Sequence, residues 1–164
     1  MKKQILATLV LITGVLATAT AEKTQTQTGE STSKNVVLIS AFQKLDVEGN
    51  VEVVLYEDNS NTVHIFSSPN NIAGTSVTER NGVLYIKSKR VKGEKTLVYV
   101  PVKNIEEIEA AGNAKITSAT ILSTQDLTLL LNGDCKIDVQ VTGNIHVLEG
   151  DVSEVIYEKK LSRI

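Results

Sequence analysis

The sequence predicts an all-β fold: a β-solenoid (β-helix-like) of about 20-residue coils in the C-terminal half, preceded by an antiparallel sheet or sandwich-like N-terminal half. Two observations support this prediction. Apolar and polar residues alternate over long stretches, which is the pattern of strands with one buried face. Glycine followed by Asn or Asp also recurs, and this pair is typical of corners that lead back into a strand.

The first 21 residues predict a signal peptide. Met1-Lys2-Lys3 gives a positive start, an apolar run extends from Ile5 to Ala17, and Ala19-Thr20-Ala21 supplies the small residues of a cleavage site. The apolar run is shorter than the about 20 residues that a spanning helix needs. We therefore expect export through a Sec-type signal peptide to the periplasm, the cell surface or the medium. No integral membrane segment is expected after cleavage.

The remaining chain is expected to form one domain over residues 36–157. Residues 22–35 contain no aliphatic side chain, so they predict a flexible polar leader, and residues 158–164 predict a charged C-terminal tail. Loss of Lys2 and Lys3 with the signal peptide lowers the basic residues from 17 to 15, against 19 acidic ones, a net charge of −4. An acidic balance of this kind disfavours nucleic acid and anionic lipid as partners.

The first half of this domain contains short segments rich in β-formers. Residues alternate between apolar and polar from Leu45 to Leu55, and further β-rich runs cover Thr62–Ser67, Gly82–Ser88 and Thr96–Pro101. Pro69 to Gly74 predicts one short helical turn. Because these strands show no 20-residue period, we expect an antiparallel sheet that also covers one end of the solenoid.

The second half contains the longest alternation, from Leu127 to Val147. This run is far longer than a usual strand, so the chain must turn while one side stays inward, with Gly133 and Gly143 as the corners. A meander of ordinary hairpins is the alternative for residues 104–157.

Short segments that begin with glycine resemble one another along the chain. The segments starting at Gly112, Gly133 and Gly150 are spaced 21 and 17 residues apart, and Gly49-Asn50 begins a similar one. The only cysteine, Cys135, takes the apolar place in its segment that Val51, Ala114 and Val152 take in theirs. We therefore expect Cys135 to be a buried, unreactive thiol.

The order of these segments resembles the family called putative auto-transporter adhesin, head GIN domain, over roughly residues 36–157. The matching segments are Phe42–Gly49 with Val51–Val53, Asn81–Ile86, Val98–Pro101, Ile105–Ile116 and Leu127–Ile137. The resemblance implies an exported β-helix-like domain with an adhesive role. It implies no catalytic residue.

No residue pattern predicts nucleophilic or metal chemistry. His64 and His146 are expected at the surface, and Cys135 points to the opposite side from His146, so a Cys/His pair is not expected. Asp134 and Asp151 form an acidic ladder if they stack, but corner turns explain both without calcium. We predict no catalytic residue, no metal site and no cofactor, and we leave the ligand-binding residues unassigned.

Three groups of charged residues remain as candidates. Outward carboxylates of the kind that glycoside cleavage needs occur at Glu107, Glu109, Asp134, Asp138 and Glu149. Glu106, Glu107 and Glu109 form an acid cluster that is expected to solvate one face. A basic cluster, predicted to be a solvated hairpin tip or an anion-binding loop, consists of Lys87, Lys89, Arg90, Lys92 and Lys95.

These observations predict an exported, non-catalytic scaffold domain that presents an extended β face to a glycan or protein ligand at the cell envelope. Two alternatives stay open: a β-helix-type polysaccharide-active enzyme and a structural component of the envelope. Aromatic residues make up 4% of the chain, with no Trp, so few side chains can stack on sugars. This disfavours the polysaccharide-active enzyme.

Overall fold

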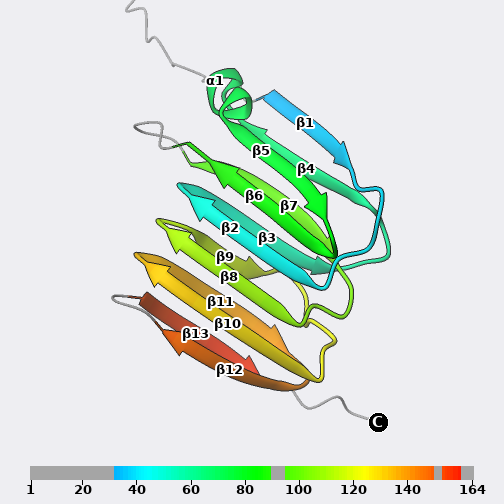
Figure 1. Cartoon of the computed structure of the whole chain (residues 1–164), viewed down its shortest axis with the longest axis vertical. Coiled ribbons are helices and arrows are strands. Elements are labelled where there is room, and N and C mark those ends of the chain that lie inside the picture. The colour runs from blue at the N-terminus through cyan, green and yellow to red at the C-terminus, as the bar shows by residue number, and fades with distance from the viewer. Residues whose placement is uncertain (1–31, 90–94, 150–152, 160–164) are drawn as a thin grey trace, which may run out of the picture.

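The computed structural model describes residues 32–89, 95–149 and 153–159 (Figure 1). The predicted signal peptide and most of the predicted leader lie outside these residues. Arg90 and Lys92 of the basic cluster, the Gly150-Asp151 corner and the end of the predicted tail also lie outside them.

The described chain forms two sheets packed face to face, with one short helix, α1 (Pro69–Ala73), at one end (Figure 1). The six-stranded sheet has the order β12 (Asn144–Glu149), β10 (Asp126–Gly133), β8 (Glu107–Gly112), β2 (Lys44–Gly49), β6 (Val83–Ser88) and β5 (Thr75–Arg80). The seven-stranded sheet has the order β1 (Thr32–Val37), β4 (Thr62–Ser67), β7 (Thr96–Val102), β3 (Val51–Glu57), β9 (Lys115–Ser118), β11 (Cys135–Val141) and β13 (Ser153–Lys159).

The all-β prediction is confirmed, but the predicted solenoid half and separate antiparallel half are wrong. Both halves of the chain contribute strands to the same two mixed sheets, which form a sandwich-like arrangement with mostly parallel pairings. Strand β2 pairs in parallel with β8, and β3 pairs in parallel with β9. Antiparallel pairing is confined, among the described strands, to β1 with β4, β4 with β7, and β5 with β6.

Contacts over a long sequence separation join the two halves. Asn113 Nδ2 donates to Asn50 Oδ1 at 3.0 Å, and Lys115 Nζ lies 2.6 Å from Glu52 Oε1, each pair being 63 positions apart. Alternating hydrophobicity tells which side of a strand faces a core, but it does not tell which strand is its neighbour. This is why the pattern predicted the strands correctly but assigned them to the wrong sheets.

The core lies between the two sheets, and the alternation seen in the sequence defines it. Leu127, Leu129, Ile137 and Val139 are all buried, as expected for one side of β10 and β11. Cys135 is also buried in this core, as predicted, with 1% of its surface exposed.

At three of its passages from the six-stranded to the seven-stranded sheet, the described chain turns at a glycine. Gly49, Gly112 and Gly133 each end a strand of the six-stranded sheet and have φ values of +101°, +82° and +96°. They are register partners across β2, β8 and β10. The left-handed backbone that favours glycine therefore places the three corners side by side. The same register also aligns the opposite ends of these strands, where β2, β8 and β10 begin.

Strand β1 begins at Thr32, so residues 32–35 are strand where the sequence predicted leader. The antiparallel pairing of β1 with β4 relies on backbone hydrogen bonds, which do not require apolar side chains. His64 Nδ1 and Asn35 Oδ1, 2.9 Å apart, add a side-chain contact across this pair. The lack of aliphatic side chains is therefore the reason that the sequence did not predict a strand at residues 32–35.

Candidate functional site

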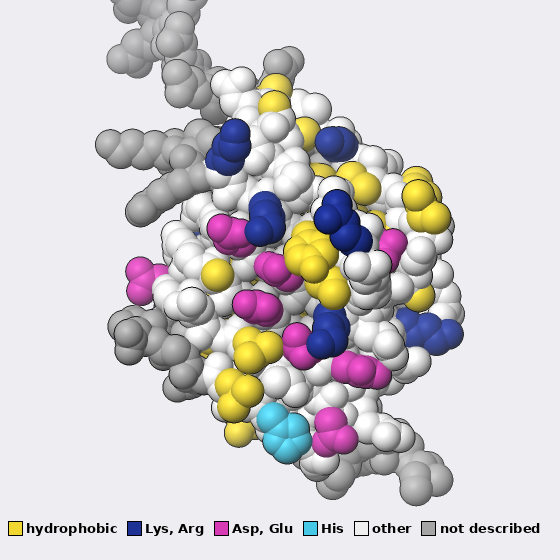
Figure 2. Space-filling view, viewed as in Figure 1, with side chains coloured by type: hydrophobic (Ala, Val, Ile, Leu, Met, Phe, Trp, Pro, Cys, Tyr) yellow, Lys and Arg dark blue, Asp and Glu magenta, His cyan; other side chains and the backbone are white. Residues whose placement is uncertain are grey.

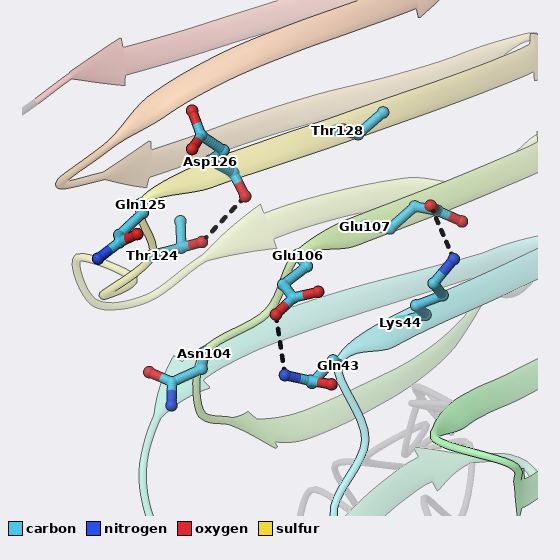
Figure 3. A pocket seen from close by; sticks show the side chains of 9 residues that line it. All are labelled: Gln43, Lys44, Asn104, Glu106, Glu107, Thr124, Gln125, Asp126 and Thr128. Carbon is cyan, nitrogen blue, oxygen red and sulfur yellow. Dashed lines mark hydrogen bonds and ion pairs between the residues drawn. The ribbon is translucent and has the colours of Figure 1, made fainter.

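A polar groove crosses the six-stranded sheet where strands β2, β8 and β10 begin (Figure 3). Its volume is about 610 Å³. The side chains that line it are Gln43, Lys44, Asn104, Glu106, Glu107, Thr124, Gln125, Asp126 and Thr128. We call this site the strand-start groove.

Parallel pairing brings these residues together. Lys44, Glu107 and Thr128 are register partners on three neighbouring strands, and all three side chains point outward because their strand neighbours are buried. Backbone bonds fix the approach to the strands: Glu106 N donates to Gln43 O at 2.8 Å, and Thr128 N donates to Glu106 O at 2.8 Å. The groove is therefore built on sheet backbone rather than on independent loops.

Side-chain contacts hold the groove's polar groups in place. Gln43 Nε2 donates to Glu106 Oε1 at 2.8 Å, and Lys44 Nζ lies 3.1 Å from Glu107 Oε2 (Figure 3). At the far side, Asp126 Oδ1 accepts from Asn144 Nδ2 at 3.0 Å. Each of the three carboxylates thus has a side-chain partner.

The groove and the face around it are acidic. Glu106, Glu107 and Asp126 line the groove, and Lys44 is the one cation among its lining residues. Beyond it, Glu109 stands next to Asp46 in register, so two more carboxylates lie side by side. Figure 2, seen from the side of the six-stranded sheet, shows acidic side chains spread over this face among fewer basic ones. None of the groove's lining side chains is aromatic.

The predicted acid cluster is only partly in this site. Glu106 and Glu107 line the groove, whereas Glu109 is exposed further along β8. The sequence analysis did not identify Gln43, which lies just before the strand. A signal was present: extending the match between the Gly49 and Gly112 segments backward aligns Gln43-Lys44 with Glu106-Glu107.

The two histidines and the cysteine lie apart. His64 contacts Asn35 on the seven-stranded sheet, whereas His146 lies on the six-stranded sheet with its Nε2 3.5 Å from Asp126 Oδ1. Cys135 is in the core, where its Sγ lies 3.5 Å from Asn132 O. Burial raises the pKa of this thiol, which favours the unreactive protonated form.

The described members of the predicted basic cluster, Lys87, Lys89 and Lys95, do not line the groove. Lys87 Nζ pairs with Glu48 Oε2 at 2.7 Å, and this hydrogen bond raises the pKa of the Lys87 ammonium. Lys89 and Lys95 are exposed.

The outward carboxylates Asp134 and Asp138 are exposed and line no part of the groove, and the side chain of Glu149 lies outside the described residues. Asp151 lies outside them as well, so a stack of Asp134 on Asp151 stays a prediction. Within the described ranges, no group of three or more His, Cys, Asp or Glu residues is placed to hold a metal ion.

A second surface that the sequence analysis missed lies on the outer face of the seven-stranded sheet. Phe66 and Tyr99 contact edge to face, with ring centroids 5.7 Å apart at 89°. Tyr99 pairs in register with Val54, two residues before Tyr56, so the three rings follow a diagonal across β4, β7 and β3. We call Phe66, Tyr99 and Tyr56 the aromatic diagonal. Low overall aromatic content concealed this local grouping.

Among the residues that the structure describes, no helix has the length and apolar character needed to cross a membrane.

A sequence profile of the family described as putative auto-transporter adhesin, head GIN domain, matches residues 41–153. No curated protein matches the sequence of the chain.

Solved structures show the same fold at low sequence identity. A putative adhesin from Bacteroides fragilis has a TM-score of 0.54 and 19% identity, and the match covers 74% of this chain and 63% of that chain. A putative adhesin from Parabacteroides distasonis has a TM-score of 0.51 and 17% identity, covering 79% of this chain and 70% of that chain. The chain thus spans less than two thirds of the length of the Bacteroides fragilis protein.

Proposed function

Because this chain belongs to the putative auto-transporter adhesin, head GIN domain family, we propose that it is an exported, non-catalytic, adhesion-type domain. It binds a glycan or protein ligand at the cell envelope through the strand-start groove of its six-stranded sheet. The supporting observation is the strand-start groove, whose polar side chains are held by hydrogen bonds on paired strands. A site that is ordered before binding loses less entropy when the ligand arrives.

The test is retention on a panel of immobilised polysaccharides and extracellular matrix proteins. Saturable retention on one class, with the polymer left at its original chain length, is the expected result. Retention on nothing in the panel would contradict the adhesive function. Shortened polymer would instead support the alternative of a polysaccharide-active enzyme, for which an acid and a base or nucleophile must flank the scissile bond.

A structural role in the envelope is the second candidate, because the last described strands of the two sheets at one end of the sandwich carry exposed apolar side chains. Strands β12 and β13 end the two sheets, and Leu148, Ile156 and Tyr157 on them are 57%, 55% and 54% exposed. Exposed edges and apolar side chains favour association with another chain. A concentration-dependent increase in particle mass, measured by light scattering, would favour this candidate.

A further inference from the structure

Resting on the proposed binding function, we infer that the strand-start groove takes a neutral, hydroxyl-rich glycan and discriminates against anionic polymers. The inference follows from three properties of the groove: its charge, its hydrogen-bonding groups and its direction across the strands.

The charge of the groove opposes an anionic ligand. Glu106, Glu107 and Asp126 provide three carboxylates, and the single cation, Lys44, is already paired with Glu107 at 3.1 Å. A ligand carboxylate or sulfate placed about 4 Å from the carboxylate of Glu106, whose partner Gln43 is neutral, is disfavoured at least roughly fivefold, even in water-like dielectric. A polymer with one charge per sugar would meet this repulsion repeatedly.

The hydrogen-bonding groups of the groove suit sugar hydroxyls, each of which both donates and accepts. Gln43 and Glu106 form an amide–carboxylate pair at 2.8 Å. Because an amide has two N–H donors and a carboxylate has about four acceptor positions, this pair keeps capacity for a ligand. Thr128 adds a hydroxyl on the neighbouring strand. The groove therefore offers both donors and acceptors to a sugar hydroxyl.

The groove runs across the strands rather than along them. Lys44, Glu107 and Thr128 occupy the same register position on β2, β8 and β10, so the three polar side chains span two strand spacings, about 10 Å. This spacing presents a row of polar groups to a short linear stretch of sugar units lying on the sheet (Figure 3).

The experiment compares retention of the purified, exported protein on neutral mannan and β-glucan with retention on anionic polygalacturonate and heparin. It is done at about 0.01 M salt, where the Debye length is about 30 Å and charge repulsion is fully expressed. The expected result is retention on a neutral polymer and none on either anionic one. Stronger retention on an anionic polymer would overturn the inference while leaving the proposed adhesive function in place. Retention on none of the four would overturn the inference, and retention on the matrix proteins of the wider panel would then decide whether the proposed adhesive function stands.

Three variants locate the site. Gln43→Ala removes one hydrogen-bonding side chain and is expected to weaken neutral-glycan binding about threefold to tenfold. Glu106→Lys reverses the charge at one position of the groove. This variant is expected to lose retention on the neutral polymer and to gain retention on heparin. The matched control, Glu109→Gln, alters an exposed carboxylate on β8, the strand that follows Glu106, outside the groove and should bind as the unaltered protein does.

Thermal unfolding of each variant shows whether a loss of binding reflects loss of the fold. If a folded Gln43→Ala protein and a folded Glu106→Lys protein both retain full neutral-glycan binding, the groove is not the site and the inference is wrong. In that case the aromatic diagonal on the other sheet becomes the surface to test.

Discussion

Gly49 and Ser88 are register partners on the parallel strands β2 and β6, and they lie so close that a Cβ on Gly49 would overlap the carbonyl oxygen of Ser88. Gly49 also has a φ of +101°. The glycine therefore has two independent reasons to be glycine: the left-handed backbone that turns the chain into the other sheet, and the approach of a neighbouring strand.

Gly49→Ala is expected to lower the free energy of unfolding by about 2–4 kcal/mol, because left-handed strain and backbone overlap act together. Gly82→Ala is the matched control, since Gly82 has a φ of +76° but nothing within 4 Å of its Cβ position. It should cost only about 1–2 kcal/mol. Urea unfolding of both variants makes the comparison, and equal losses would show that the Ser88 contact contributes nothing.

A buried hydroxyl cluster closes the core at the end near α1. Thr75 Oγ1 donates to Asn71 O at 2.8 Å and lies 3.2 Å from Ser88 Oγ and 3.3 Å from Thr96 Oγ1. Thr75→Val keeps the shape but leaves buried hydroxyls with fewer partners, so a loss of about 1–3 kcal/mol in the free energy of unfolding is expected. Thr78→Val, at an exposed position of the same strand, should change it by less than about 0.5 kcal/mol. An unchanged free energy of unfolding in Thr75→Val would show that the hydroxyl cluster does not stabilise the fold.

The thiol of Cys135 should react slowly with a thiol reagent in the folded protein at neutral pH and rapidly in urea. Burial raises the pKa of Cys135, so the folded state holds the thiol proton more tightly than the unfolded state does. This contribution to stability is fully present below the unfolded-state pKa and is lost as pH rises through the folded-state pKa. Cys135→Ala should remove this part of the alkaline pH dependence. Fast labelling of the native protein would show that Cys135 is not a buried, unreactive thiol.

The contact between Phe66 and Tyr99 should appear as a coupling in a double-mutant cycle. With the rings edge to face at 5.7 Å, replacing both residues by Leu, singly and together, is expected to give a coupling free energy of about 0.5–1.5 kcal/mol. The same variants should leave retention on a neutral glycan unchanged, because they lie on the opposite sheet from the groove. Reduced retention in folded variants would move the binding site to the aromatic diagonal.

Part of the candidate site was readable from the sequence. Glu106 and Glu107 were recognised as an acid cluster, because adjacent carboxylates beside apolar residues are visible in any sequence. Their partners Gln43 and Lys44 were not recognised, because each pair is 63 positions apart and the match between the Gly49 and Gly112 segments was not extended back to them; the contact itself forms only where β2 pairs with β8. The tyrosines of the aromatic diagonal were counted, but their alignment across strands depends on register.

The sequence by itself determined the all-β character, the inward side of β10 and β11, the burial of Cys135 and the glycine corners. Each of these follows from a local cause: a period of two along a strand, a small apolar side chain, or a backbone angle that favours glycine. Only the tertiary structure decided that both halves share two mixed sheets and that Lys44, Glu107 and Thr128 line one groove. Those features depend on which strand lies beside which. Backbone hydrogen bonds between strands are the same for every sequence, so the choice of neighbour rests on long-range packing that the alternation within one strand does not record.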